Sequence, residues 1–466
     1  KRSVMRMLMR FSISNFMSFG YKEDADGNII PEEFHLYAGR SEQYKERVLK
    51  HEGRKVLKFS SIYGANASGK SNLIKAIECG KNILTGTFEK VNYKEQYCRS
   101  KKENKEFPTQ FEYEFTIKDN AYAYGFTVNL AEEKVLSEWL YKLEEEKEKV
   151  IYERIVEEQE YYFDENMFCS KEEIQQFHYF LQDSNRINTS LFLYEIYRRN
   201  IENPEFQIFK DVYEWFKRKL IIIYPETATP QSYFLFESEN ERLIQILNYL
   251  DTGITSYIMQ SLNETAFREY FPKSELADTF LKISKKPDRR KVVSVLKTGD
   301  TLIRIKYGEE KAEKIEKLMF KHGLDETAYE FGEESDGTRR LIELLAVILN
   351  DKEDMVFVVD ELDRSFHPKM TIKFVETFLK LSKESNTQLI ITTHESNLMD
   401  LKILRRDEIW LAERELDNTT TLFPFDKYKV RNDKIIDTDY LDGRYGAVPI
   451  FKDFDYVWGK ESVWKD

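Results

Sequence analysis

The sequence predicts an α/β fold that carries an antiparallel β subdomain and a mostly helical insertion. An apolar strand runs straight into a glycine-rich turn and then into a helix, and two pairs of sharply alternating segments follow. A long charged and aromatic stretch with helical spacing separates these elements from a second group of apolar strands. With 466 residues, of which 41% are hydrophobic, the chain can bury a large core and corresponds to roughly two to four domain-sized units.

The opening of the chain contains two predicted strands. Residues 7–19 alternate between polar and apolar side chains, and residues 56–62 form a more apolar run that leads into Gly64. Alternation with a period of two is typical of a half-buried strand. A predicted helix follows the glycine-rich turn, with an apolar face formed by Leu73, Ile74 and Ile77.

Two pairs of alternating segments predict antiparallel hairpins. Residues 111–117 and 122–130 carry aromatic or apolar side chains at every second position and are joined by a short polar connection. Residues 136–143 and 150–155 form another such pair, joined by a charged stretch. Alternating runs separated by a short turn are the signal of a β-hairpin. These segments therefore predict the β subdomain.

Three segments follow from the order of these patterns. The first, 1–165, contains the glycine-rich turn and the hairpins, and the second, 166–325, has the charged and aromatic spacing of helices. Apolar strands and helices return in the third segment, 326–466. We therefore expect one domain that is split in sequence, with its halves reassembled around a helical insertion. The elements expected in the third segment are a helix over 338–349, a strand over 355–359, a helix over 370–381 and a strand over 389–393.

Several functional classes are disfavoured by composition. No stretch approaches the roughly 18 to 20 apolar residues of a membrane span, and the first ten residues lack the apolar core of a signal peptide. We therefore expect a cytoplasmic protein without membrane contact. The cysteines show neither CxxC nor Cys/His spacing, which predicts reduced thiols rather than disulfides or a zinc site. They are Cys79, Cys98 and Cys169.

The formal net charge of −12 argues against indiscriminate coating of DNA, because affinity for phosphates needs clustered positive charge. One local cluster could still contact nucleic acid, although such runs more often mark solvated loops. This basic cluster consists of Lys285, Lys286, Arg289, Arg290 and Lys291.

Residues 64–71 carry the first chemical motif. They read Gly-Ala-Asn-Ala-Ser-Gly-Lys-Ser and match the P-loop pattern GxxxxGK[ST] between a predicted strand and a predicted helix. Glycines let the backbone wrap so that its N–H groups and the helix N-terminus point at phosphate oxygens. We expect Lys70 to reach the β- and γ-phosphates and the Ser71 hydroxyl to bind Mg²⁺. The predicted phosphate-binding residues are Gly64, Asn66, Ala67, Ser68, Gly69, Lys70, Ser71 and Asn72.

Residues 355–361 form an apolar strand that ends in Asp360 and Glu361, as a Walker B motif requires. Asp360 can hold Mg²⁺ through water, and Glu361 can polarise the attacking water. Such a strand is common, but here Asp363 follows directly and His394 closes the next apolar strand. A single histidine is more often structural. At this spacing we expect His394 to sense the γ-phosphate.

Residues 335–338 read Ser-Asp-Gly-Thr and stand immediately ahead of an apolar helix. A serine hydroxyl and a glycine backbone at a helix N-terminus suit the binding of a γ-phosphate. Alone, the segment could be a helix cap formed by Ser335 or Asp336. Its position between the P-loop and Walker B predicts an ABC signature in which Ser335 and Gly337 contact nucleotide.

The order of these motifs resembles the ABC ATPases of the SMC, RecF and OLD group, and the fold that this implies is an ABC-type P-loop NTPase domain. Several stretches are similar to the RloA or AbiLi type of phage-defence ATPase, a class to which the ATPase of the PARIS system is also similar. The resemblance covers essentially the whole chain, although the insertion matches only in position. The stretches are 9–19, the Asn-Ala-Ser-rich P-loop, 334–340, 360–368 and 440–449.

The resemblance implies a head-to-tail homodimer, or a higher homo-oligomer, in which one subunit's P-loop and the other's signature sandwich ATP and Mg²⁺. Ser335 and Gly337 would then act in trans, and Asp363 would lie at the dimer seam. Asp336 departs from the second glycine that is usual in an ABC signature. Either its carboxylate points away from the γ-phosphate, or the dimer forms differently. Gln110 is the candidate for a Q-loop glutamine.

The resemblance also implies an ATPase that acts as a nucleotide-gated switch in antiviral defence by abortive infection. OLD nucleases carry a TOPRIM domain after the ATPase, but the segment after His394 is too short for another domain of about 100 residues. We therefore expect a separate toxic or nucleolytic effector, for example a TOPRIM protein of the RloB type. One alternative is a RecF-like or SMC-like DNA-repair ATPase that clamps DNA directly. Another is a scaffold whose ATP is structural. The sequence has no Asn-Lys-x-Asp motif, which favours ATP over GTP.

Overall fold

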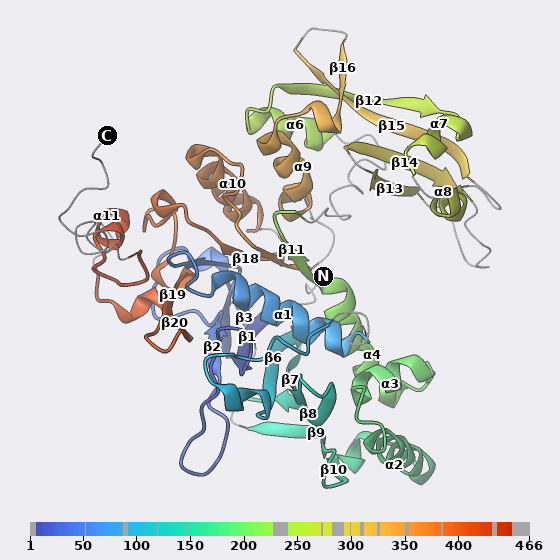
Figure 1. The fold of residues 1–466 in the computed structure, drawn as a ribbon, viewed down its shortest axis with the longest axis vertical. Helices are drawn as coiled ribbons and strands as arrows, with labels where there is room; N and C mark the ends of the chain where they lie inside the picture. The colour runs from blue at the N-terminus through green and yellow to red at the C-terminus, as the bar shows by residue number, and fades with distance from the viewer. Residues whose placement is uncertain are drawn as a thin grey trace, which may run out of the picture. The chain divides into compact units, whose positions relative to one another are not determined.

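A computed structural model gives the fold of the chain as two compact units (Figure 1). The first unit contains Lys1–Leu220 and Ile390–Asp466, and the second contains Ile221–Leu389. These units divide the chain by compactness, whereas the three expected segments follow the order of motifs. The structure describes residues 6–51, 53–86, 92–118, 120–145, 147–226, 241–271, 274–281, 293–298, 300–307, 312–323, 327–349, 354–383, 385–430 and 436–449.

A seven-stranded antiparallel sheet forms much of the first unit, in the order β10-β9-β8-β7-β6-β1-β2. Both predicted hairpins are confirmed, because β6 pairs with β7 and β8 with β9. Aromatic side chains at every second position share one face, so that Phe111 lies opposite Phe126 and Phe115 opposite Tyr122. The strands are β1 (Leu8–Ser14), β2 (Glu32–His35), β6 (Thr109–Ile117), β7 (Asn120–Asn129), β8 (Lys134–Leu143), β9 (Glu148–Ile155) and β10 (Glu160–Phe163).

A second sheet has the order β11-β17-β18-β5-β19-β20, and the two boundaries between the units fall within β11 and within β18. The strand expected over 56–62 is split, because β4 pairs with β3 in a small hairpin while β5 pairs in parallel with β19. Every residue of β5 is buried. The strands are β3 (Val48–His51), β4 (Arg54–Leu57), β5 (Phe59–Tyr63), β11 (Leu220–Ile223), β17 (Val356–Val359), β18 (Gln388–Thr392), β19 (Ile409–Arg414) and β20 (Thr420–Pro424).

Three helices of the first unit gather beside β8–β10 (Figure 1). They are α2 (Lys171–Asn185), α3 (Phe192–Arg199) and α4 (Gln207–Glu214), and they confirm the helices expected early in the insertion. Phe177, Phe192 and Phe209 fill the space between them with ring-to-ring contacts. A π-helical turn over Trp215–Lys219 follows α4 and leads to β11.

The second unit contains an antiparallel sheet in the order β12-β15-β14-β13, with β16 paired to β15. Helices α7 and α8 lie beside it, and Phe267, Ile303 and Ile305 belong to their common core (Figure 1). These strands were not predicted, because their many lysines and glutamates resemble the exposed face of a helix. The elements are α6 (Glu241–Tyr249), β12 (Ile254–Leu262), α7 (Glu264–Glu269), α8 (Ser274–Leu281), β13 (Val293–Thr298), β14 (Thr301–Tyr307), β15 (Ala312–His322) and β16 (Ala328–Glu330).

The elements expected after the insertion are confirmed. Helices α9 (Asp336–Leu349) and α10 (Pro368–Leu381) alternate with β17 and β18. The segment 440–449 begins within the short helix α11 (Ile436–Leu441). The Tyr440 hydroxyl donates to the Ala447 carbonyl at 3.1 Å, and the Tyr445 hydroxyl donates to Asp439 at 3.1 Å. These local bonds fold the segment back on itself.

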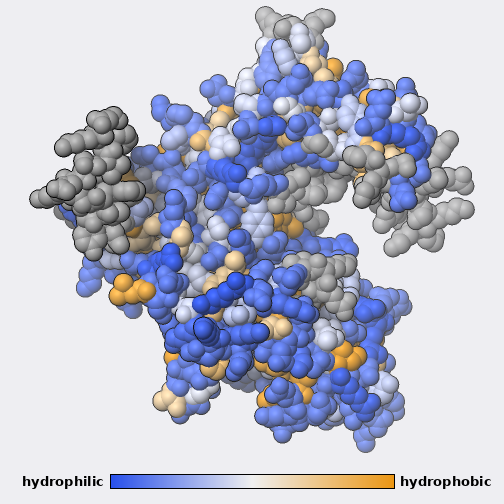
Figure 2. Space-filling view, viewed as in Figure 1, coloured by the Kyte–Doolittle hydropathy of each residue, from blue (hydrophilic) through white to orange (hydrophobic). Residues whose placement is uncertain are grey.

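Apolar side chains are concentrated in the interiors of the two units. Figure 2 shows one face of the molecule, on which hydrophilic residues predominate and apolar residues form small, separate groups. No helix within the described part of the chain is both long enough and apolar enough to cross a membrane.

Candidate functional site

The P-loop connects β5 to α1 (Lys70–Leu84) in the first unit. Its backbone is left-handed at Ala67 (φ 62°) and at Gly69 (φ 104°). A Cβ at Gly64 would overlap with the carbonyl oxygen of Ala412, and a Cβ at Gly69 would overlap with the hydroxyl of Thr420. Glycine is therefore required at both positions, because the chain turns tightly and other groups pack directly against it.

The Lys70 side chain is buried inside this turn. Its Nζ donates to the carbonyl oxygens of Gly64 at 2.7 Å and Ala65 at 3.1 Å. Lys70 thus holds the loop curled around its ammonium group, at the N-terminus of a 15-residue helix. Both the positive charge and the helix N-terminus favour the binding of an anion there.

The Ser68 hydroxyl gives a direct test of whether the loop fits a polar ligand. Ser68 is 2% exposed, and its Oγ makes no hydrogen bond to the described residues. A buried hydroxyl without a partner is costly, so it indicates a place for a polar group. Asn66 and Ala67 are exposed at the tip of the turn, whereas Ser71 and Asn72 are half-buried. The loop therefore combines a cation, a buried hydroxyl and the N-terminus of α1, which together suit an anion such as phosphate.

A pocket of about 750 Å³ lies beside the start of α1 and includes Ser18 and Asn72. Asn72 Nδ2 donates to Ser18 Oγ at 2.8 Å. Most of the other lining side chains are polar, which suits a nucleoside better than an apolar ligand. They include Asn92, Glu95, Gln96, Arg99, Arg414 and Asn418.

His394 follows β18 and is exposed. The residue before it, Thr393, donates its main-chain N–H to Ile62 of β5 at 3.2 Å. Ile62 stands two residues ahead of Gly64. The first unit therefore brings the chain that carries His394 next to the strand that enters the P-loop.

The carboxylates at the end of β17 belong to the second unit. Asp360 is 4% exposed, and its main-chain N–H donates to Ile223 at 2.9 Å. Glu361 is left-handed (φ 47°) and half-buried, so the chain turns sharply there. The Arg364 guanidinium lies 3.7 Å from the Glu361 carboxylate and also pairs with Glu226. This places a cation beside the carboxylate that we expect to polarise water.

Arg340 of α9 is buried and donates a hydrogen bond to the start of the same turn. It is 4% exposed, and its guanidinium donates to the carbonyl oxygens of Tyr224 at 3.0 Å and Asp360 at 3.4 Å. Burial lowers the pKa of Arg340, with the nearby Glu343 opposing that change. Sequence reasoning assigned no role to Arg340, although it falls within one of the stretches that carry the resemblance.

The predicted signature also lies in the second unit, at the start of α9. Ser335 Oγ accepts the main-chain N–H of Thr338 at 3.1 Å, as a helix cap does. The Asp336 carboxylate pairs with Arg339, whose guanidinium also lies 3.4 Å from Asp300. A Cβ at Gly337 would stand 2.9 Å from the carbonyl oxygen of Ser365.

The start of α9 and the turn 360–366 are therefore packed closely together in the second unit. This turn includes Asp363, which is half-buried. The negative charge of Asp336 is balanced locally by Arg339. In one of the two alternatives for Asp336, its carboxylate points away from the γ-phosphate. The ion pair with Arg339 turns the carboxylate toward its own helix.

Two further predictions concern residues outside these motifs. Gln110 lies in β6, opposite Thr127, and is half-buried. The basic cluster falls within 282–292, outside the described residues. Across the ranges that the structure describes, no group of three or more His, Cys, Asp or Glu side chains is arranged to hold a metal ion.

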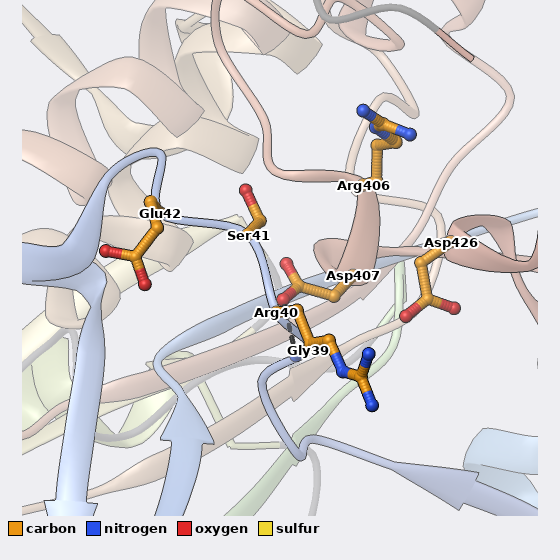
Figure 3. Close-up of a pocket in the computed structure, with 7 residues that line it drawn as sticks. All are labelled: Gly39, Arg40, Ser41, Glu42, Arg406, Asp407 and Asp426. Carbon is orange, nitrogen blue, oxygen red and sulfur yellow. Dashed lines mark hydrogen bonds between the residues drawn. The ribbon is translucent and has the colours of Figure 1, made fainter. Parts of the chain in front are cut away.

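Another pocket, of about 550 Å³, contains none of the predicted site residues (Figure 3). The main-chain N–H of Gly39 donates to Asp407 at 2.7 Å, which ties the two sides of this pocket together. Its charged lining mixes both signs. The lining residues are Gly39, Arg40, Ser41, Glu42, Arg406, Asp407 and Asp426.

The sequence matches a family model described as "AAA domain, putative AbiEii toxin, Type IV TA system" over residues 59–161 and 180–400, more than half of the chain. The chain belongs to this AAA-domain family. The matched ranges include the P-loop, the segment 335–338, both Walker B carboxylates and His394. Membership in the AAA-domain family supports a nucleotide-binding role for the P-loop.

Several solved structures are similar to the chain. An SMC head bound to the C-winged helix domain of ScpA is 12% identical, with a TM-score of 0.39 over 89% of this chain and 96% of that chain. The SMC head domain from Thermotoga maritima is 12% identical, with a TM-score of 0.32 over 90% of this chain and 98% of that chain. The structure of cbiO1 from Clostridium perfringens, part of the ABC transporter complex cbiONQ, is 9% identical, with a TM-score of 0.28 over 90% of this chain and 90% of that chain. Because these TM-scores lie below 0.5, the similarities support no argument about function. No curated protein matches the chain.

Proposed function

We propose that this protein binds ATP and Mg²⁺ at the P-loop and hydrolyses ATP to ADP and phosphate. The observation that carries the proposal is the geometry of 64–70, where two crowded glycines, a left-handed Ala67 and the buried Lys70 curl the backbone at the start of α1. The polar pocket beside Asn72 would take the nucleoside. Such a cradle has no evident purpose in a protein that binds no phosphate.

The proposed roles follow from the chemistry of each group. Lys70 would leave the loop carbonyls for the β- and γ-phosphates. The Ser71 hydroxyl and the Asp360 carboxylate, the latter through water, would hold Mg²⁺, which when bound would neutralise phosphate charge. Glu361 accepts a hydrogen bond from the attacking water, and His394 contacts the γ-phosphate.

We further propose that the active form is a homodimer or higher homo-oligomer in which Ser335 and Gly337 contact the ATP of the partner subunit. Asp363 would then lie at the seam. The pairing of Asp336 with Arg339 supports this arrangement, because a neutralised carboxylate repels a γ-phosphate less than a free one. The packing of Gly337 against the turn 360–366 would move the signature and the catalytic carboxylates together.

The proposed biological role is a nucleotide-gated switch in antiviral defence, acting in the cytoplasm on a separate toxic or nucleolytic effector. The family description, which names a putative AbiEii toxin and a type IV toxin–antitoxin system, supports a role of this kind. A coupling of about 1–3 kcal/mol between sites is enough to gate a partner.

The test compares ATP hydrolysis and molar mass for the wild type, Glu361→Gln and Lys70→Ala. We expect wild type to turn over, Glu361→Gln to bind ATP without turnover and to shift to a dimer or larger assembly in light scattering, and Lys70→Ala to lose binding. Two exposed residues provide matched controls, Glu376→Gln and Lys75→Ala, which should behave as wild type.

The results also separate the competing functions. Absence of ATP binding by the wild type would refute the proposal. Turnover that rises with bare DNA would instead favour a DNA-clamping repair ATPase. For the defence role, Lys70→Ala should abolish protection against phage in cells, and protection that survives this change would exclude the switch.

A further inference from the structure

A row of hydrogen-bonded polar groups lies against the outside of the P-loop in the first unit. Asn72 Nδ2 donates to Ser18 Oγ at 2.8 Å, and 2.7 Å separates Ser18 Oγ from Thr420 Oγ1. The Thr420 hydroxyl reaches the main-chain oxygen of Ser68 at 2.8 Å. The row therefore joins the start of α1, the loop after β1 and the first residue of β20 to the loop itself.

The chemistry of these groups determines which of them donates and which accepts in each hydrogen bond. The Ser68 carbonyl can only accept, so the single hydroxyl proton of Thr420 must point at it. Thr420 Oγ1 then accepts from the Ser18 hydroxyl, which in turn accepts from the Asn72 amide. All bonds run one way and end on the P-loop backbone, an arrangement in which neighbouring hydrogen bonds strengthen one another.

Thr420 has little freedom to move. It is 1% exposed, and its main-chain N–H donates to the Ser18 carbonyl at 2.7 Å, so both its backbone and its side chain are fixed to the same residue. Its hydroxyl lies where a Cβ at Gly69 would stand. The close approach explains why Gly69 is needed and shows that Thr420 packs directly on the loop.

The carbonyl that Thr420 holds belongs to the peptide unit between Ser68 and Gly69. In a trans peptide the C=O and the N–H point in opposite directions. Fixing the Ser68 oxygen outward therefore fixes the Gly69 N–H toward the inside of the loop. Without this bond the Ser68–Gly69 peptide could rotate more easily, because Gly69 (φ 104°) can adopt both positive and negative φ values.

We propose that Thr420 is a positioning residue for phosphate binding, which holds the Ser68–Gly69 peptide with its N–H turned into the P-loop. The proposal rests on the proposed ATP-binding function and adds a residue that none of the motifs contains. Thr420 acts through the backbone of the loop and makes no contact with the ligand itself.

The experiment measures binding of the β,γ-imido analogue of ATP with Mg²⁺ by calorimetry. We expect Thr420→Val, which keeps the shape but removes the hydroxyl, to weaken binding about tenfold, a loss of about 1.4 kcal/mol. Thr420→Ser restores the hydroxyl and should bind within about twofold of wild type. Thr421→Val is the matched control, because Thr421 is the next residue of β20 and points to the opposite face of the strand.

Steady-state kinetics add a second readout. Thr420→Val should raise KM with little change in kcat, since the bond acts on ground state and transition state alike. If Thr420→Val does not fold, as judged by circular dichroism, Thr420→Ala replaces it and should also weaken binding about tenfold. Binding at wild-type strength in the folded Thr420→Val, or in Thr420→Ala if that variant is needed, would overturn the proposal. So would a Thr420→Ser protein as weak as Thr420→Val.

These outcomes are distinct from failure of the proposed function. If the wild type binds no analogue, the ATP site itself is refuted and the positioning role falls with it. If the wild type binds and the variants bind equally, only the role of Thr420 is refuted.

Discussion

Glu138 should be the most sensitive single position for anchoring α3 to the seven-stranded sheet. Its carboxylate is fully buried and accepts five hydrogen bonds in addition to an ion pair with Arg154. Arg154 Nε donates at 3.0 Å, and Arg154 also forms a fully buried ion pair with it at 2.9 Å. The remaining donors are the Tyr124 and Tyr152 hydroxyls, at 2.9 and 2.6 Å, and the main-chain N–H groups of Phe192 and Leu193, at 2.7 and 3.0 Å.

The two main-chain donors belong to the first turn of α3, where no helical partner exists. Glu138→Gln keeps the shape but presents an NH₂ group to donors and leaves the Arg154 charge unbalanced. Removing one partner of a buried ion pair costs about 3–5 kcal/mol, because the other charge stays buried without compensation. Arg154 keeps bonds to Ser184 and Ser190, which do not neutralise it.

Hydrogen exchange measured by mass spectrometry is the suitable assay, since a chain of two compact units need not unfold in one step. A cost of 3 kcal/mol at this site corresponds to faster exchange by about 100-fold in peptides covering 192–199. Glu153→Gln is the control, because Glu153 is half-buried on β9 and accepts one bond, from Tyr141 at 2.8 Å. Exchange within threefold of wild type in Glu138→Gln would refute the capping role of this carboxylate.

Two further predictions concern the nucleotide domain. Gly69→Ala should abolish ATP binding in calorimetry, because the added Cβ overlaps with the Thr420 hydroxyl and φ is positive; binding within twofold of wild type would contradict this. Burial raises the pKa of Glu408 from 4.5 to about 7 against the opposing charge of Arg47. The raised pKa means that stability from Glu408 is fully present below pH 4.5 and is lost as the pH rises through about 7. Urea midpoints should therefore fall between pH 5 and 8 less steeply in Glu408→Gln than in wild type, and equal slopes would exclude the effect.

The parts of the fold that the sequence predicted correctly are those with a local signal. The hairpin of β6 and β7 alternates over its whole length, and the P-loop is contiguous, so neighbouring residues were enough to place them. The strands β12–β15 were not predicted, because lysine and glutamate surround Ile315 in β15 and the apolar run 318–320 is only three residues long. Their identity as strands depends on pairing with each other, which a local pattern does not contain.

The candidate site shows the same limit at the level of single residues. Ser18 lies within the opening stretch that carries the family resemblance, but nothing in its neighbours indicates that it bonds to Asn72. Thr420 has no motif around it at all. Its role depends on a contact with Ser68 across 352 residues of chain, which only the folded structure contains.

That long separation has a consequence for the newly made protein. Chains are synthesised at roughly 5–20 residues per second, so a ribosome that has finished Ser68 needs roughly 20–70 seconds to reach Thr420. The second unit is translated in full during this interval. The P-loop sequence is therefore made before the second unit, whereas the strand that holds its backbone is made after that unit, and a nascent chain gains its full nucleotide affinity only once β20 has been made.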